Sequence, residues 1–321
     1  MAGSATPAAV TAPAEVQAPA IRVRGLRKVF GSTVAVSGMD LDVPAGAVLG
    51  VLGPNGSGKT TMIRMLLALS RPTAGTVELL GAPMPAGAGA VLPHVGALVE
   101  NPGFHPFLSG RENLRRCAAA EPLLSTRAIP DAVQDVLSRV GLASAAERRY
   151  RAYSLGMKQR LGLAAVLLVP RRLVILDEPT NGLDPAGTRD VRTIIAELHT
   201  GGATVLVSSH LLAEVEATCT HVAVLDHGSL IAAGPLAALL GGEAPALDVC
   251  TPDSAIAMQA LREAGIGCSI GPTGVRVDLA GIDPPTVVAL LVGAGVAVHE
   301  VQRRRTGLDE LFAQLTEGNS P

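Results

Sequence analysis

The feature that most constrains the fold of this chain is a glycine-rich segment with the pattern G-x-x-x-x-G-K-[ST]. An apolar run, residues 47–52, precedes it, and residues 60–69 follow it with apolar side chains at helical spacing. A strand, a loop and a helix in this order are the context that a phosphate-binding loop requires. The candidate phosphate-binding residues are Gly53, Pro54, Asn55, Gly56, Ser57, Gly58, Lys59, Thr60 and Thr61.

The residue types in this segment explain how it would hold a nucleotide. Glycines let backbone N–H groups close around phosphate oxygens, and the new helix offers its positive end. Lys59 would add a full charge at the β- and γ-phosphates, and Thr60 is placed to bind Mg²⁺. Among the 26 lysines and arginines only Lys28, Lys59 and Lys158 are lysines, so a lysine at position 59 is not explained by the composition of the chain. A compact ammonium fits into such a loop, whereas a planar guanidinium would not.

The composition excludes several classes of protein. With 321 residues, 48% hydrophobic and 17% charged, the chain is long and apolar enough for about two domains. A net charge of -2 gives no basic surface for nucleic acid, so no nucleic-acid partner is expected. The apolar run at 286–298 is too short to span a bilayer.

The N-terminal segment and the cysteines favour a cytoplasmic protein. Residues 1–20 are rich in Ala and Pro without a basic residue, which predicts a disordered extension and not a signal peptide. The four cysteines have no metal-ligand or C-x-x-C spacing, so we expect four ordinary buried thiols in a reducing compartment.

Two carboxylates end a predicted buried strand at residues 172–180. Asp177 and Glu178 would be costly there without a partner, and Mg²⁺ bound to phosphate is a natural one. Asp177 would then hold the metal's water shell, and Glu178 would act as the base for an attacking water. The alternative is a structural cap or salt bridge. A second buried strand, residues 204–210, ends in His210 at the same rim, where a γ-phosphate contact is favoured over a structural role.

Further candidates lie at turns. Phe30, one of six aromatics, stands at an expected turn before the phosphate loop and could stack on a base, although a core role is the alternative. Ser154 is placed to cap a helix, and its capped start could face a second nucleotide. A predicted strand runs into Glu100 and a loop with Phe104 and Phe107, which suggests a docking surface unless both rings pack in the core. Residues 83–89 are expected to be a loop, and 111–120 and 131–141 helices.

Taken together, these motifs resemble the ordered motif set of ATP-binding-cassette (ABC) ATPases. The resemblance covers residues 21–236 and rests on the phosphate loop and on the segments 154–159, 176–180, 182–184 and 208–210. It is most similar to the ATPase subunits of bacterial exporters of the daunorubicin and bacitracin resistance type, which have counterparts of segments 97–100, 209–216 and 308–312. The resemblance implies ATP and Mg²⁺ as cofactors.

The resemblance also implies roles for single residues. Phe30 would stack on adenine, and His210 would be the switch histidine. Glu100 takes the position of the family's glutamine, next to Mg²⁺ and the γ-phosphate. Residues 154–159 correspond to the family's signature segment. The resemblance carries over Ser154 and Gly156 from this segment, and Asp184 from the turn at 182–184, as nucleotide-binding residues. Leu155 stands where the general family has glycine, and Met157 where it has glutamine.

The expected fold is an α/β P-loop NTPase of ABC type, with a mixed sheet, an antiparallel β subdomain and a helical subdomain at about 101–170. The ATPase domain would span 21–240, after the extension 1–20. Residues 241–321 would form a small α+β accessory domain, because their pattern is β-α-β-β-α-β, typical of a ferredoxin-like fold, with a last helix at 308–316. No aromatic precedes Phe312 there, which argues against RNA binding.

The expected function is that of an ATP-hydrolysing subunit at the cytoplasmic face of the membrane. A homodimer would place each phosphate loop against the partner's Ser154 segment and would drive a separate multi-span permease that exports a drug, antibiotic or lipid-like compound. A GTPase would need Asn-Lys-x-Asp, which the sequence lacks. The remaining alternative is a soluble regulatory ABC ATPase that acts on a non-transport partner.

Overall fold

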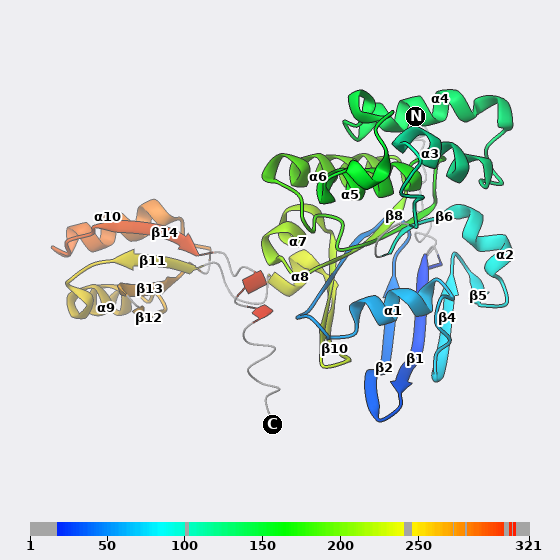
Figure 1. Ribbon diagram of the computed structural model, residues 1–321. Coiled ribbons are helices and arrows are strands. Elements are labelled where there is room, and N and C mark those ends of the chain that lie inside the picture. Colours follow the sequence, from blue (N-terminus) through cyan, green and yellow to red (C-terminus); the bar gives the residue numbers. More distant parts are fainter. Residues whose placement is uncertain are drawn as a thin grey trace, which may run out of the picture.

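The centre of the fold is a six-stranded sheet with the order β10-β9-β3-β8-β7-β6 (Figure 1). The computed structural model describes residues 18–99, 103–240, 246–271, 273–279, 281–304, 308–309 and 311–312. The strands of this sheet are β3 (Val48–Leu52), β6 (Val95–Leu98), β7 (Leu173–Asp177), β8 (Thr204–Ser209), β9 (His221–Asp226) and β10 (Ser229–Pro235). Their pairing is parallel except between β9 and β10, which confirms the predicted mixed sheet.

The inner strands are buried on both faces, as their unbroken apolar sequences require. In β7, Val174 and Leu176 belong to one hydrophobic cluster, while Leu173 and Ile175 belong to the cluster on the opposite face. Parallel strands covered on both faces have such apolar runs. The polar residues that follow these strands therefore meet at one edge of the sheet.

A second, antiparallel sheet with the order β2-β1-β4-β5 packs against this centre. Its strands are β1 (Ile21–Phe30), β2 (Thr33–Val43), β4 (Ala74–Leu79) and β5 (Ala82–Met84). The prediction of a loop at 83–89 is wrong, because β5 and α2 (Ala88–Val91) occupy most of it. Pro83 pairs opposite Glu78 at the edge of the sheet, where a missing N–H donor costs no hydrogen bond.

Helices cover both faces of the central sheet (Figure 1). The helices of this part of the chain are α1 (Lys59–Leu66), α3 (Gly110–Ala119), α4 (Ile129–Arg139), α5 (Leu155–Val166), α6 (Pro185–Thr200), α7 (Leu212–Thr218) and α8 (Leu236–Leu240), with 3-10 turns at Leu92–His94, Thr126–Ala128, Ala143–Ala145 and Tyr150–Ala152. Helices α3 and α4 pack on α5. The predicted helices at 111–120 and 131–141 are confirmed as α3 and α4. Helix α3 starts with a capping box in which the Ser109 N–H donates to the Glu112 carboxylate (2.7 Å), and this bond lowers the pKa of that carboxyl.

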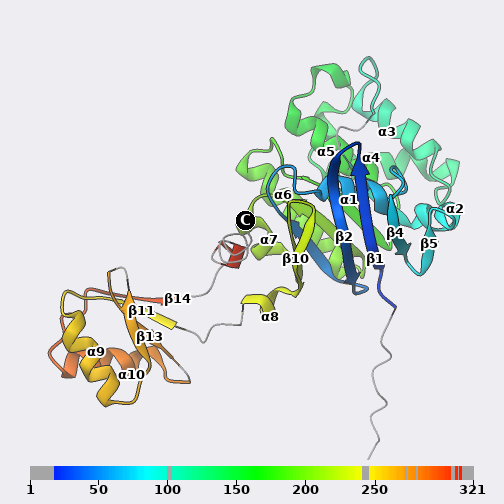
Figure 2. The ribbon, with the colours of Figure 1, turned by 90° about the horizontal axis from the view of Figure 1, so that it is seen from below.

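The C-terminal region forms a third sheet with the order β12-β13-β11-β14 (Figure 2). Its elements are β11 (Ala246–Cys250), α9 (Ser254–Glu263), β12 (Cys268–Gly271), β13 (Gly274–Asp278), α10 (Pro284–Gly293) and β14 (Glu300–Arg304). All pairings are antiparallel, and both helices share one hydrophobic cluster with the strands. The predicted ferredoxin-like fold is confirmed. The last strand starts at Glu300 rather than 296, because Val296 packs in the cluster and the Ala297 N–H donates to Asp253.

Two further expectations concern the burial of the cysteines and the absence of a membrane-spanning helix. Cys219 is fully buried, but Cys117, Cys250 and Cys268 are half-buried, so the prediction of four buried thiols is wrong for three of them. In the part of the chain that the structure describes, every helix is too short or too polar to cross a bilayer.

Candidate functional site

The glycine-rich segment forms the loop between β3 and α1, and its conformation depends on glycine. Gly58 has φ +100°, and a Cβ on it would lie 2.6 Å from the carbonyl oxygen of Ala35 in β2. A side chain would therefore be strained in the backbone and would also collide with the neighbouring strand. The predicted strand, loop and helix around the motif are confirmed.

The start of α1 leaves its N–H groups free to bind an anion. Its N-cap residue is Gly58, which offers no side-chain cap, and no acidic residue lies in the first turn. The hydroxyl of Ser57 is buried and has no hydrogen-bond partner among the residues that the structure describes. Unpaired donors at the positive end of a helix are what phosphate oxygens bind. These features fit the triphosphate group that the sequence predicts.

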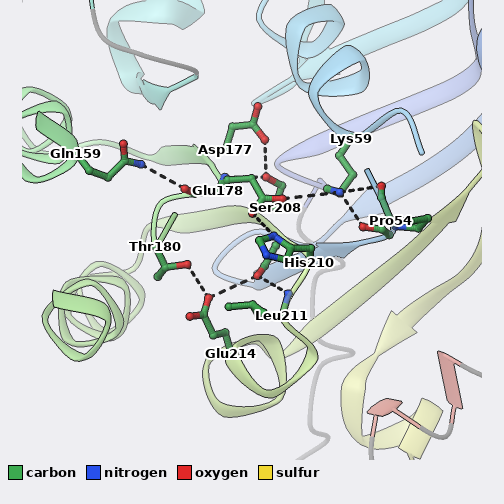
Figure 3. A network of polar contacts seen from close by, with 12 residues as sticks. Pro54, Lys59, Gln159, Asp177, Glu178, Thr180, Ser208, His210, Leu211 and Glu214 are labelled. Carbon is green, nitrogen blue, oxygen red and sulfur yellow. Dashed lines mark hydrogen bonds and ion pairs between the residues drawn. The ribbon is translucent and has the colours of Figure 1, made fainter. Parts of the chain in front are cut away.

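Lys59 lies beneath this loop with its ammonium held in place. The side chain is 6% exposed, and Nζ donates to the carbonyl oxygens of Gly53 (2.7 Å) and Pro54 (3.2 Å), as Figure 3 shows. It also lies 3.8 Å from Oε1 of Glu178. The charge is thus fixed beside both the loop and the strand-end carboxylates.

Of the two predicted carboxylates, Asp177 is the last residue of β7 and Glu178 follows it, and Ser208 contacts both. The Ser208 hydroxyl donates to Oδ1 of Asp177 (2.5 Å) and accepts from the backbone N–H of Glu178 (2.9 Å). Glu178 has φ +48°, a conformation uncommon outside glycine that persists only when neighbouring contacts hold it. A further contact comes from α5, where Nε2 of Gln159 donates to the Glu178 carbonyl (3.3 Å).

His210 completes the cluster from the end of β8. Its Nδ1 lies 2.7 Å from Oε2 of Glu178, and the ring is half exposed (Figure 3). A cavity of about 440 Å³ opens beside these groups. It is lined by Ala35, Asn55, Gly56, Ser57, Gly58, Lys59, Thr60, Thr61, Glu178, Asn181 and His210. The structure therefore brings the phosphate loop, the predicted base and the predicted γ-phosphate contact to one cavity.

The predicted residues Ser154, Asp184 and Phe30 do not line this cavity. Ser154 caps α5 by accepting from the Met157 N–H (3.2 Å), which confirms the predicted cap, and Asp184 caps α6 through the Gly187 N–H (3.0 Å). Phe30 is 52% exposed at the end of β1, with the Lys28 ammonium 4.8 Å from its ring centroid, so it is not a core residue. Glu100 lies outside the described residues.

The signature segment and the turn after β7 interlock through leucines and glycines. A Cβ on Gly182 would lie 2.3 Å from Cδ2 of Leu155, and a Cβ on Gly156 would lie 3.2 Å from Cδ2 of Leu183. Each leucine thus covers the glycine of the other segment. The unusual Leu155 has a contact within the same chain, although it is still 56% exposed.

The two loop phenylalanines differ. Phe104 packs edge-on against Tyr150, with ring centroids 5.3 Å apart, and belongs to the border of the large hydrophobic cluster. The expectation that both rings are exposed is therefore wrong for Phe104. Phe107 is 58% exposed, with the Arg151 guanidinium 5.2 Å from its centroid.

Sequence reasoning missed Ser208, Gln159 and Asn181 as contributors to the site. Ser208 appears in the sequence only as a serine inside a buried strand, and a polar residue in such a strand is a signal that could have found it. Gln159 and Asn181 carry no comparable signal, because their contacts depend on how α5 and the turn after β7 fold together.

Comparison with known proteins places this geometry in a family. The family described as ABC transporter matches residues 36–181. A daunorubicin resistance ATP-binding protein of Streptomyces coeruleorubidus is 38% identical over 315 residues, covering 92% of this chain and 96% of that protein. A bacitracin transport ATP-binding protein of Enterococcus faecalis is 40% identical over 212 residues, covering 66% of this chain and 68% of that protein.

The same family is found among solved structures. The ATP-binding subunit of an ABC transporter superposes with a TM-score of 0.63 at 26% identity, covering 68% of this chain and 91% of that one. The match extends over nine-tenths of that chain, so the likeness concerns a whole cassette. This chain belongs to the family of ABC transporter ATP-binding proteins.

Proposed function

We propose that this chain is the ATP-hydrolysing subunit of an exporter that moves a drug, antibiotic or lipid-like compound through a separate membrane subunit. The observation that carries the ATPase assignment is the contact between Glu178 and His210 at the mouth of the phosphate-loop cavity. Similarity to daunorubicin resistance and bacitracin transport proteins supports the exporter assignment.

The chain's own residues supply the parts of the hydrolytic step. Lys59 and the first N–H groups of α1 hold the phosphates, while Glu178 accepts the proton of the attacking water. His210 orients the Glu178 carboxylate and faces the γ-phosphate position. Mg²⁺, when bound, neutralises charge on the phosphates. Thr60, Asp177 and Glu100 are the oxygen donors that would hold it, and such donors suit this hard cation.

We further propose that two copies act together across their nucleotides. Ser154, Gly156 and Asp184 lie outside the cavity of their own chain, and the start of α5, which Ser154 caps, can face the nucleotide of a second copy. Phe30, exposed on β1, is proposed to stack on adenine. No nucleic-acid partner is proposed.

The proposed domain division keeps 21–240 as the ATPase domain and 241–321 as the accessory domain. The separate hydrophobic cluster that runs from Leu247 to Val296 supports an accessory unit. Leu308, Leu311 and Phe312, from the predicted last helix, pack instead against the large cluster of the ATPase. The chain would therefore be joined to the ATPase on both sides of the accessory fold.

The permease contact is proposed to include Phe107, which is large, apolar and exposed. We expect Phe107→Ala to leave the basal hydrolysis rate unchanged, since the ring lies outside the ATP cavity, and to remove most of the stimulation by the permease. Ile270→Ala is the matched control, because Ile270 is also exposed but lies in β12. Equal stimulation of both variants would contradict a contact at Phe107.

The test of the exporter assignment is reconstitution in vesicles with a candidate permease subunit. We expect ATP-dependent accumulation of daunorubicin or bacitracin, and no accumulation with Glu178→Gln. An active ATPase that neither binds the membrane protein nor responds to it would favour the regulatory alternative instead. Retention of the chain on those membranes would also test the proposed peripheral location.

A further inference from the structure

Glu214 connects the two loops that carry Glu178 and His210. Its Oε2 accepts a hydrogen bond from the hydroxyl of Thr180 (2.7 Å) and lies 3.5 Å from the hydroxyl of Ser209 (Figure 3). Thr180 is two residues beyond Glu178, and Ser209 directly precedes His210. One carboxylate oxygen therefore contacts both loops, from a position outside the cavity lining.

The helix that carries Glu214 is fixed on the central sheet. Val215, the next residue in α7, is buried against Gly50 of β3. A Cβ on Gly50 would lie 2.4 Å from Cγ1 of Val215 and 2.9 Å from Sγ of Cys219. Burial raises the pKa of Cys219 to about 12, so this thiol is a neutral packing group. Helix α7 therefore packs closely on β3 at Gly50, and this packing holds the backbone that carries Glu214.

The loops that Glu214 joins need such support. Glu178 holds its φ of +48° only while its neighbours constrain it. The Ser209 hydroxyl also accepts from the Leu211 N–H (3.0 Å), and this hydrogen bond links the two residues on either side of His210. Thr180, Ser209 and Glu214 line one small cavity of about 20 Å³ together with Arg192 of α6.

We propose that Glu214 is a positioning residue for ATP hydrolysis, which holds the Glu178 loop and the His210 loop at the spacing that keeps their 2.7 Å side-chain contact. The inference rests on the proposed roles of Glu178 and His210. Without Glu214, Thr180 loses its acceptor, Ser209 loses one of its two partners, and the base and the histidine move independently. Nucleotide binding does not depend on this link, because Lys59 and the start of α1 are held by other contacts.

The test compares single substitutions by steady-state ATPase kinetics on the full chain. Glu214→Ala and Thr180→Val should each lower kcat about 10-fold while KM for ATP changes less than about 2-fold, because misplaced catalytic groups slow the chemical step more than binding. Glu214→Gln keeps an acceptor oxygen for Thr180 and should recover most of the rate. Glu216→Ala is the matched control, since Glu216 is an exposed acid on the same helix. Melting temperatures show whether a slower variant is still folded. If Glu214→Ala does not fold, Thr180→Val still tests the contact, because it replaces only the hydroxyl by a methyl group.

A double substitution separates positioning from general damage. In a His210→Ala background, adding Glu214→Ala should cost less than about 2-fold further, because the contact to be positioned is already gone. The proposal is overturned if the rate losses of His210→Ala and Glu214→Ala multiply in the double variant. It is also overturned if Glu214→Ala raises KM at constant kcat, or if both Glu214→Ala and Thr180→Val keep the wild-type rate. A wild-type chain without ATPase activity, or an active Glu178→Gln, would instead overturn the proposed function.

Discussion

The variant Glu178→Gln is expected to hydrolyse ATP about 10³-fold more slowly than the wild type, because a general base contributes roughly 10²- to 10⁴-fold. Glutamine has nearly the same shape and keeps an oxygen that can pair with the Nδ1–H of His210, but it cannot take a proton from water. The phosphate loop and Lys59 remain intact, so the affinity for ATP should change little.

Single-turnover hydrolysis and calorimetric titration measure these two quantities separately. The matched control is Glu216→Gln, which makes the same chemical change on an exposed acid of α7 and should keep the wild-type rate. A Glu178→Gln variant with more than about a tenth of the wild-type rate would show that another group accepts the proton. Lost ATP binding would show that the carboxylate has a binding role instead.

The variant Lys59→Ala is expected to weaken ATP binding about 100-fold or more. A charge-assisted hydrogen bond to phosphate contributes about 1.5–3 kcal/mol, and 2.7 kcal/mol corresponds to about 100-fold in Kd. Lys59 is 6% exposed, so no water can replace its ammonium at the loop without entering a buried position. Its loss would also leave Glu178 without the cation that lies 3.8 Å away.

A second substitution at Lys59 tests shape separately from charge. Lys59→Arg keeps the positive charge, but a planar guanidinium is too large for the position between the carbonyls of Gly53 and Pro54. We expect it to bind ATP nearly as poorly as Lys59→Ala in calorimetric titration. Near-wild-type affinity in the arginine variant would contradict a tightly shaped ammonium position, and near-wild-type affinity in both would remove Lys59 from the ATP site.

Most of the fold could be predicted because its signals are local. The β-α-β-β-α-β order of the C-terminal region follows from apolar periodicity and from turns, and the phosphate loop follows from glycines between a strand and a helix. The carboxylates at the end of β7 and the histidine after β8 could be grouped because parallel neighbouring strands end at one edge. The 2.7 Å distance between His210 Nδ1 and Glu178 Oε2 agrees with this grouping.

What the sequence could not predict depends on tertiary packing. Phe104 and Phe107 stand in the same loop, yet only the former finds Tyr150 from a segment more than forty residues away. In the sequence, Glu214 is one of two acids on a short helix, and only the fold brings it to Thr180. Neither contact has a periodicity or a motif that single-sequence reasoning could use.

The most direct test of the account is the mass of Glu178→Gln in solution, measured by light scattering with and without ATP and Mg²⁺. If two copies close over nucleotides that Glu178 hydrolyses, the variant should have the monomer mass of 32.6 kDa without ATP and twice that mass with it. Wild-type protein should return to the monomer as ATP is consumed. A variant that binds ATP in calorimetry but stays monomeric would contradict the proposal that hydrolysis takes place between two copies.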